Sequence, residues 1–177
     1  MQKPASLRQR IIGFAFDFLI LSGYLVILAA IFLPLTFGPM RSQMTALAST
    51  PLRLNLLAFC TTILPFTLYF SLQESSPAQA TWGKSKAGIR VATLKGERVK
   101  FWRTLLRSVA KFLPWQIAHT CIFFIPNNLP QPGWVMAGLV LAQVWVVIYL
   151  LVLWLNKTHR TPYDWIARTE VIQDDSR

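Results

Sequence analysis

The feature that most constrains the fold is the apolar run from Ile11 to Leu33, which contains a single charged residue, Asp17. A run of this length crosses the hydrocarbon core of a bilayer as one helix. An ionisable side chain inside such a helix is costly, so it marks a candidate functional site. Because seven residues make almost two helical turns, Arg10, Gly13, Asp17 and Tyr24 lie on one stripe. We predict that this stripe faces away from lipid.

Three further apolar runs predict an all-α integral membrane protein, a single domain over residues 1–177 with four transmembrane helices at about 11–33, 52–72, 107–125 and 133–155. The third run is the shortest. Residues 112–125 alone make a helix of about 21 Å, less than the hydrocarbon core of about 30 Å. The third helix must therefore begin near Arg107, or else be re-entrant. In the second run, we expect neighbouring helices to tolerate Pro65.

The distribution of basic residues predicts the orientation. The chain has 18 Lys and Arg against 7 Asp and Glu. Only Arg41 and Arg53 lie in or beside the connection between the first two runs. With four crossings, the positive-inside rule places all other basic residues, and both termini, on the cytoplasmic side of the cytoplasmic (inner) membrane. Because these charges lie beside apolar runs and accompany no nucleic-acid-binding motif, we expect the lipid bilayer as partner and no nucleic acid.

The region between the second and third runs is polar and basic. Weak alternation over residues 87–93, followed by a turn at 95–97, predicts a small β-hairpin on the membrane surface. The spacing of Arg103, Arg107 and Lys111 then predicts an interfacial helix that leads into the third crossing. We expect a group of basic residues in this region to face anionic headgroups, namely Lys84, Lys86, Arg90, Lys95, Arg98 and Lys100.

Asp17 requires compensation because it lies inside an apolar helix. A direct pair with Arg10 is awkward because about 10 Å separates the two Cα atoms along the helix axis. We therefore predict a cation from the third helix as the partner of Asp17, with Arg107 favoured over Lys111 because a guanidinium binds a carboxylate with two donors. The alternative is that the pair serves only to fix helix packing.

Two other ionisable residues have structural interpretations. Thr161, Pro162 and Asp164 fit a capping box at the start of a short surface helix. His119 lies in an apolar run and could relay protons, but a single such histidine more often bonds to a neighbouring helix.

The sequence contains no arrangement typical of an enzyme. It has no Ser/His/Asp or Cys/His grouping, no paired carboxylates and no metal-ligand spacing. Cys60 and Cys121 lie in apolar runs without CxxC spacing and are expected to be free thiols. We therefore expect no catalytic residue, no metal and no cofactor.

Together these residues resemble the RDD family, which is named for one arginine and two aspartates. Arg10 and Asp17 match its first helix, and Thr81-Trp-Gly83-Lys84 matches its Thr-x-Gly-Lys segment. Gly88-Ile-Arg-Val91 and the basic helix with Arg103 and Arg107 follow in the family's order. The family then closes with His-Asp and Gly-Thr-x-Val, where this chain has Tyr163-Asp164 and Arg168-Thr-Glu-Val171. The resemblance covers almost the whole chain and implies a membrane protein for which transport has been suggested.

Two functions remain open. The first is a small ion- or proton-coupled transporter in which Asp17 titrates; because four helices are few for a transport path, a homo-oligomer is then plausible. The second is a non-catalytic membrane scaffold that binds anionic lipid or a partner protein through its basic cytoplasmic loop. Only the first requires Asp17 to bind a proton or a cation.

Overall fold

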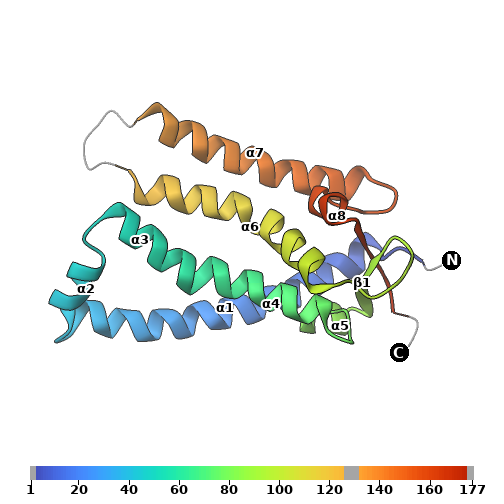
Figure 1. Cartoon of the computed structure of the whole chain (residues 1–177), viewed down its shortest axis with the longest axis horizontal. Helices are drawn as coiled ribbons and strands as arrows, with labels where there is room; N and C mark the ends of the chain where they lie inside the picture. Colours follow the sequence, from blue (N-terminus) through green and yellow to red (C-terminus); the bar gives the residue numbers. More distant parts are fainter. Residues whose placement is uncertain (1–2, 126–131, 175–177) are drawn as a thin grey trace.

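Four long helices run side by side in the computed structural model, which describes residues 3–125 and 132–174 (Figure 1). They are α1 (Leu7–Phe37), a second helix assembled from α3 (Pro51–Ala58), η1 (Phe59–Ile63) and α4 (Leu64–Ser75), then α6 (Phe101–Phe123) and α7 (Gly133–Leu155). The short helix α2 (Arg41–Leu47) lies at one end of the bundle. The other end carries α5 (Trp82–Lys86), β1 (Ile89–Thr93), α8 (Pro162–Ala167) and β2 (Thr169–Gln173).

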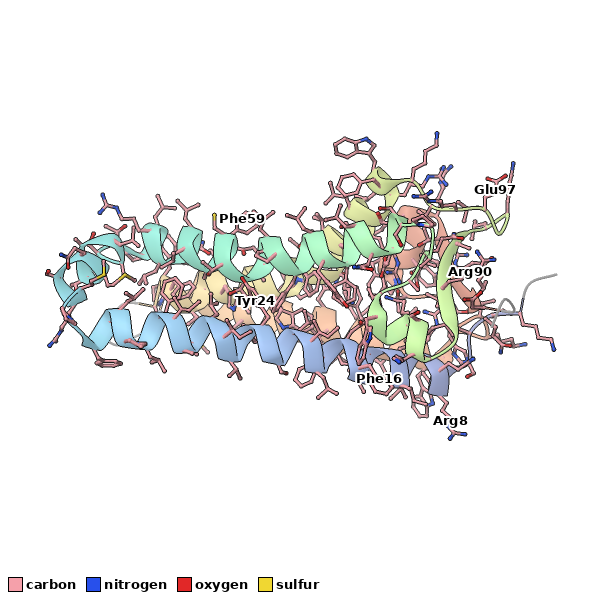
Figure 2. All side chains as sticks on the ribbon, turned by 90° about the horizontal axis from the view of Figure 1, so that it is seen from below. Arg8, Phe16, Tyr24, Phe59, Arg90 and Glu97 are labelled. Carbon is pink, nitrogen blue, oxygen red and sulfur yellow. The ribbon has the colours of Figure 1, made fainter. Side chains whose placement is uncertain are left out.

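Three of the long helices have the length and apolar composition of membrane spans: α1, the second helix over Pro51–Ser75, and α7. Their large apolar side chains are widely exposed, as a lipid-facing surface requires. Figure 2 shows the polarity changing along the bundle: carbon-rich side chains surround its middle, near Tyr24 and Phe59, whereas charged side chains gather near Arg8, Arg90 and Glu97. The structure is therefore mostly helical and of the membrane type.

The third predicted crossing corresponds to α6, which is less apolar because it carries Arg103, Arg107 and Lys111. The predicted interfacial helix and third crossing form one continuous helix that runs through Pro114 and does not turn back. Its 23 residues make about 34 Å of helix, enough for the hydrocarbon core. Crossing of the membrane by α6 stays a prediction.

Tyrosine hydroxyls from neighbouring helices compensate for two prolines inside helices. A proline has no N–H, so it leaves the carbonyl four residues earlier without its helical donor. For Pro114 that carbonyl belongs to Ala110, and Tyr149 of α7 donates to it at 2.6 Å. The carbonyl of Thr61, four residues before Pro65, accepts from Tyr24 of α1, also at 2.6 Å. These bonds explain how the bundle tolerates both prolines.

The small sheet differs from the predicted hairpin. The predicted strand at 87–93 exists as β1, but it pairs antiparallel with β2, at the end of the chain, with Val91 opposite Val171. Residues 93–98 form a tight turn, and Arg98 makes one isolated bridge back to Ala92 of β1. The physical reason is that α6 begins at Phe101, which leaves too few residues for a returning strand.

The sheet joins distant parts of the chain at one end of the bundle. Residues from the N-terminal segment, β1, the turn after it and β2 share an apolar core, made of Ala5, Ile89, Val91, Val99 and Val171. Pro4 also bridges to Ile172. The first and last described segments and the central polar region therefore lie at the same end (Figure 1). Of the predicted uncharged turn at 126–132, residues 126–131 lie outside the described residues.

Candidate functional site

Asp17 is buried in α1 and is held by neutral donors. One carboxylate oxygen, Oδ2, accepts from the Thr81 hydroxyl at 2.6 Å. The other, Oδ1, accepts from the Gly83 backbone N–H at 2.9 Å and from the Tyr69 hydroxyl at 3.2 Å. Among the described residues, no cation lies within ion-pair distance of Asp17. The prediction that Arg107 or Lys111 pairs with Asp17 is therefore wrong.

The Thr81-x-Gly83-Lys84 segment has a geometric explanation. Thr81 is the N-cap of α5: its hydroxyl accepts from the Lys84 N–H at 3.3 Å while donating to Asp17. At Gly83 a side chain would collide with the Gly13 carbonyl oxygen, and its Cβ would lie 2.6 Å from the Asp17 nitrogen. The two glycines therefore let α5 lie directly against α1, which brings the Gly83 N–H to the Asp17 carboxylate.

Arg107 of α6 connects two other acids. Its Nη1 donates to Oε1 and Oε2 of Glu74 at 2.7 and 2.6 Å, and its Nε donates to Oδ1 of Asp164 at 2.8 Å. The Arg107 side chain is 3% exposed and both carboxylates are fully buried. These pairs tie together α4, α6 and α8. Burying these charges is costly, so the network is stable only while nearly every charge has a partner.

Lys84 completes the network through Glu74. Its ammonium donates to Oε1 of Glu74 at 2.6 Å, and its side chain is 11% exposed. The expectation that Lys84 faces lipid headgroups is therefore wrong, because Glu74 draws its charge inward. Glu74 was not among the predicted site residues, although an acidic residue at the end of an apolar run is itself a signal for one.

Asp164 has both the structural role that was predicted and an ion-pair role. Its Oδ2 accepts from the backbone N–H and the hydroxyl of Thr161, which confirms the capping-box contact, and Arg10 donates to the same oxygen at 3.3 Å. Burial alone would raise the pKa of Asp164, but the Arg107 and Arg10 guanidinium groups outweigh burial and hold that pKa below its ordinary value. Asp164 is therefore a charged acceptor at neutral pH.

Tyr163 stands where the family pattern has histidine. Its ring lies 5.0 Å from the Arg107 guanidinium carbon and makes an edge contact with Tyr149. Burial raises the pKa of the Tyr163 hydroxyl, so it stays neutral. Arg168, in place of the family's glycine, ends α8 with a φ of 52°, in the left-handed region that favours glycine.

The ion pairs described above form one charge cluster, made of Arg10, Glu74, Lys84, Arg107 and Asp164. The remaining predicted residues are separate from this cluster. Lys86, Lys95, Arg98 and Lys100 are exposed, whereas Arg90 bonds to Gln79 and lies 3.9 Å from Asp174. His119 contacts Phe123, and its Nδ1 has no hydrogen-bond partner in the described part of the chain, so that nitrogen makes no bond to a neighbouring helix. Both cysteines are free thiols, as predicted. Within residues 3–125 and 132–174, no three His, Cys, Asp or Glu side chains gather as metal ligands.

A cavity of about 670 Å³ lies beside the cluster. It is partly open, and α1, η1, α6 and α7 contribute to its lining. Asp17, Arg10, Arg107, Lys84 and Lys111 all line it, together with a larger number of apolar side chains. Four residues of the predicted charge network therefore share one cavity, although Asp17 and Arg107 do not contact each other; Asp164 is not part of the lining.

Comparison with known proteins supports the resemblance seen in the sequence. The RDD family pattern matches residues 4–168, which is most of the chain. No curated protein and no solved structure shows significant similarity to this chain. The match includes the first helix with Arg10 and Asp17, the α5 segment and Asp164. This chain belongs to the RDD family.

Proposed function

We propose that this membrane protein is a small ion- or proton-coupled transporter in which Asp17 binds the proton or cation. The observation that carries the proposal is the unpaired carboxylate: Asp17 is 2% exposed, lines the cavity and, among the residues that the structure describes, bonds only to neutral donors. A buried carboxylate without a counter-charge can be neutralised by a proton or a small cation. By contrast, Glu74 and Asp164 already have cationic partners.

Neutralising Asp17 would also change how α1 is held. The closest packing of α1 is against α5, and Asp17 anchors α5 through Thr81 and Gly83. A carboxylate accepts these bonds more strongly than a carboxylic acid does. Proton or cation binding would therefore weaken or reorganise the contact between α1 and α5, which couples ion binding to movement of α1 at the cavity.

The membrane orientation is part of the proposal. Among the residues that the structure describes, the basic ones other than Arg41 and Arg53 lie in segments that meet at, or adjoin, the end with α5, α8 and the sheet. We place this end in the cytoplasm and count α6 as the third of four crossings of the cytoplasmic membrane. A homo-oligomer would enlarge the transport path.

Flux measurements in liposomes test this function. Wild-type protein should carry protons or alkali cations across the liposome membrane, and Asp17→Asn should abolish that flux. Glu97→Gln is the matched control, because it removes a carboxylate charge from an exposed residue that does not line the cavity. Folded Glu97→Gln protein should retain flux. Wild-type flux in folded Asp17→Asn protein would make the aspartate structural and would refute the proposal.

One observation favours the scaffold as a second candidate. Lys86, Lys95, Arg98 and Lys100 remain exposed at the same end of the bundle, where each could attract an anionic membrane surface by up to about 1 kcal/mol. Replacing them with Gln should release acidic lipid or a partner protein if the scaffold function is correct. Unchanged binding would leave these charges as topology determinants.

A further inference from the structure

The cavity beside the charge cluster has an apolar body. One face of α1 supplies Ile11, Phe14, Phe18, Leu21 and Leu25, and α7 supplies Val146, Leu150 and Leu153. The closest packing of α7 is against α6, and that of α1 is against α5. The two helices therefore line the cavity without being each other's main partners, so that an extended apolar chain could enter between them. The volume lies within the range of binding cavities for small ligands, about 300–1,000 Å³.

Arg10 lines this cavity with unused donors. Within the described part of the chain, its only ion pair is the 3.3 Å contact from Nη1 to Asp164. The side chain is only 8% exposed, and its Nε and Nη2 are buried without a hydrogen-bond partner among the described residues. A guanidinium offers five N–H donors, and leaving buried donors unbonded is unfavourable. Arg10 therefore lacks acceptors that a ligand could supply.

Lys111 is the second incompletely compensated cation on the same cavity. Its ammonium nitrogen lies 3.4 Å from the centre of the Phe70 ring and 5.4 Å from that of Phe112. In the part of the chain that the structure describes, no carboxylate lies within 4.0 Å of this nitrogen. The aromatic rings stabilise the cation only in part, because they neither neutralise it nor accept full hydrogen bonds.

The charge balance of the cavity favours an anion. Asp17 is an acidic lining residue, but its oxygens already accept from Thr81, Gly83 and Tyr69. Arg107 and Lys84, also in the lining, are paired with Glu74. Among the described lining residues, Arg10 and Lys111 are thus the cations with capacity to spare.

We propose that this cavity binds a lipid with an anionic headgroup. The headgroup would accept hydrogen bonds from Arg10 and Lys111, and an acyl chain would occupy the apolar space between α1 and α7. Basic pockets between transmembrane helices hold acidic headgroups in this way. A small soluble anion would satisfy the cations but would leave the apolar lining without contacts. The site differs from the exposed basic loop and does not depend on transport.

The test measures binding of phosphatidylglycerol to delipidated protein in neutral detergent, by native mass spectrometry and by thermal stability. Phosphatidylcholine with the same acyl chains is the headgroup control. Wild type should prefer phosphatidylglycerol, and Lys111→Met should weaken that binding about tenfold, as expected from the loss of one hydrogen bond to a charged group. The triple variant Lys86→Gln, Lys95→Gln, Lys100→Gln should bind like wild type.

A second variant tests the acyl-chain part without touching a charge. Val146→Trp fills space in the cavity and should also weaken phosphatidylglycerol binding. Three results would overturn the proposal: equal affinity for the two lipids, loss of binding in the triple loop variant but not in Lys111→Met, or stabilisation by inorganic phosphate equal to that by phosphatidylglycerol. The last would indicate a site for a free anion.

Discussion

Replacing Glu74 by Gln should cause one of the largest losses of stability in this chain. Glu74 is fully buried and receives three short contacts, at 2.6 and 2.7 Å from Arg107 and at 2.6 Å from Lys84. The substitution keeps the size of the side chain but removes its charge and turns one acceptor into a donor. Removing one partner of a buried pair costs about 3–5 kcal/mol. That is a large fraction of a typical folding free energy of about 5–15 kcal/mol.

Glu97→Gln provides the matched control. It removes the same charge from an exposed residue without an ion pair in the described structure, so its effect should stay within about 0.5 kcal/mol. Reversible unfolding in mixed micelles, followed by tryptophan fluorescence, gives both values. A loss below about 1 kcal/mol for Glu74→Gln, or a loss equal to that of the control, would refute this account of the cluster.

A double-mutant cycle tests the pairing itself. Glu74→Gln and Lys84→Gln should together cost less than the sum of the single losses, because the second substitution removes the cation that the first leaves unpaired. Asp17→Asn and Arg107→Gln should instead show nearly additive losses, since these residues share no direct contact. Strong coupling between Asp17 and Arg107 would favour the pair predicted from the sequence.

Three further predictions concern packing and pH. Gly83→Ala should destabilise the protein by about 1–3 kcal/mol because its Cβ collides with α1, whereas Gly23→Ala, with open space around it, should be nearly neutral in thermal unfolding. Tyr149→Phe should cost about 1–3 kcal/mol, and less in a Pro114→Ala background, where a restored N–H can serve the same carbonyl; equal costs would contradict the compensation. Because the folded-state pKa of Asp164 is depressed, its contribution should be present at neutral pH and decline as pH falls from about 5, and Asp164→Asn should flatten this part of the stability curve.

The helices were the most predictable part of the fold. A long apolar run has few alternatives to a helix in a membrane, and α7 occupies the range predicted for the fourth run. The capping box at Thr161 was also predictable because its contacts are local. The partner of β1 was not predictable from local pattern, since β2 reaches it only after the bundle has brought the two segments to the same end.

The partners of Arg107 show a second limit. The chemistry of the guanidinium favoured Arg107 as the partner of a buried carboxylate, but that chemistry does not distinguish Asp17 from Glu74 or Asp164. The choice depends on how each helix is rotated about its own axis and on α5. Helix α5 lies against α1 through Gly83 and supplies neutral donors to Asp17. It also depends on the second helix continuing to Ser75, which brings Glu74 into the bundle rather than the loop. These are tertiary effects.

Transport and lipid binding both depend on the four long helices crossing the membrane with the charge cluster at the cytoplasmic end. Thiol labelling in intact cells tests this most directly, in a background without Cys60 and Cys121. Cysteine at Ser42 should react with an impermeant reagent, whereas cysteine at Lys95 or Lys157 should react only after permeabilisation. Labelling of Lys95→Cys or Lys157→Cys in intact cells would contradict the four-crossing arrangement.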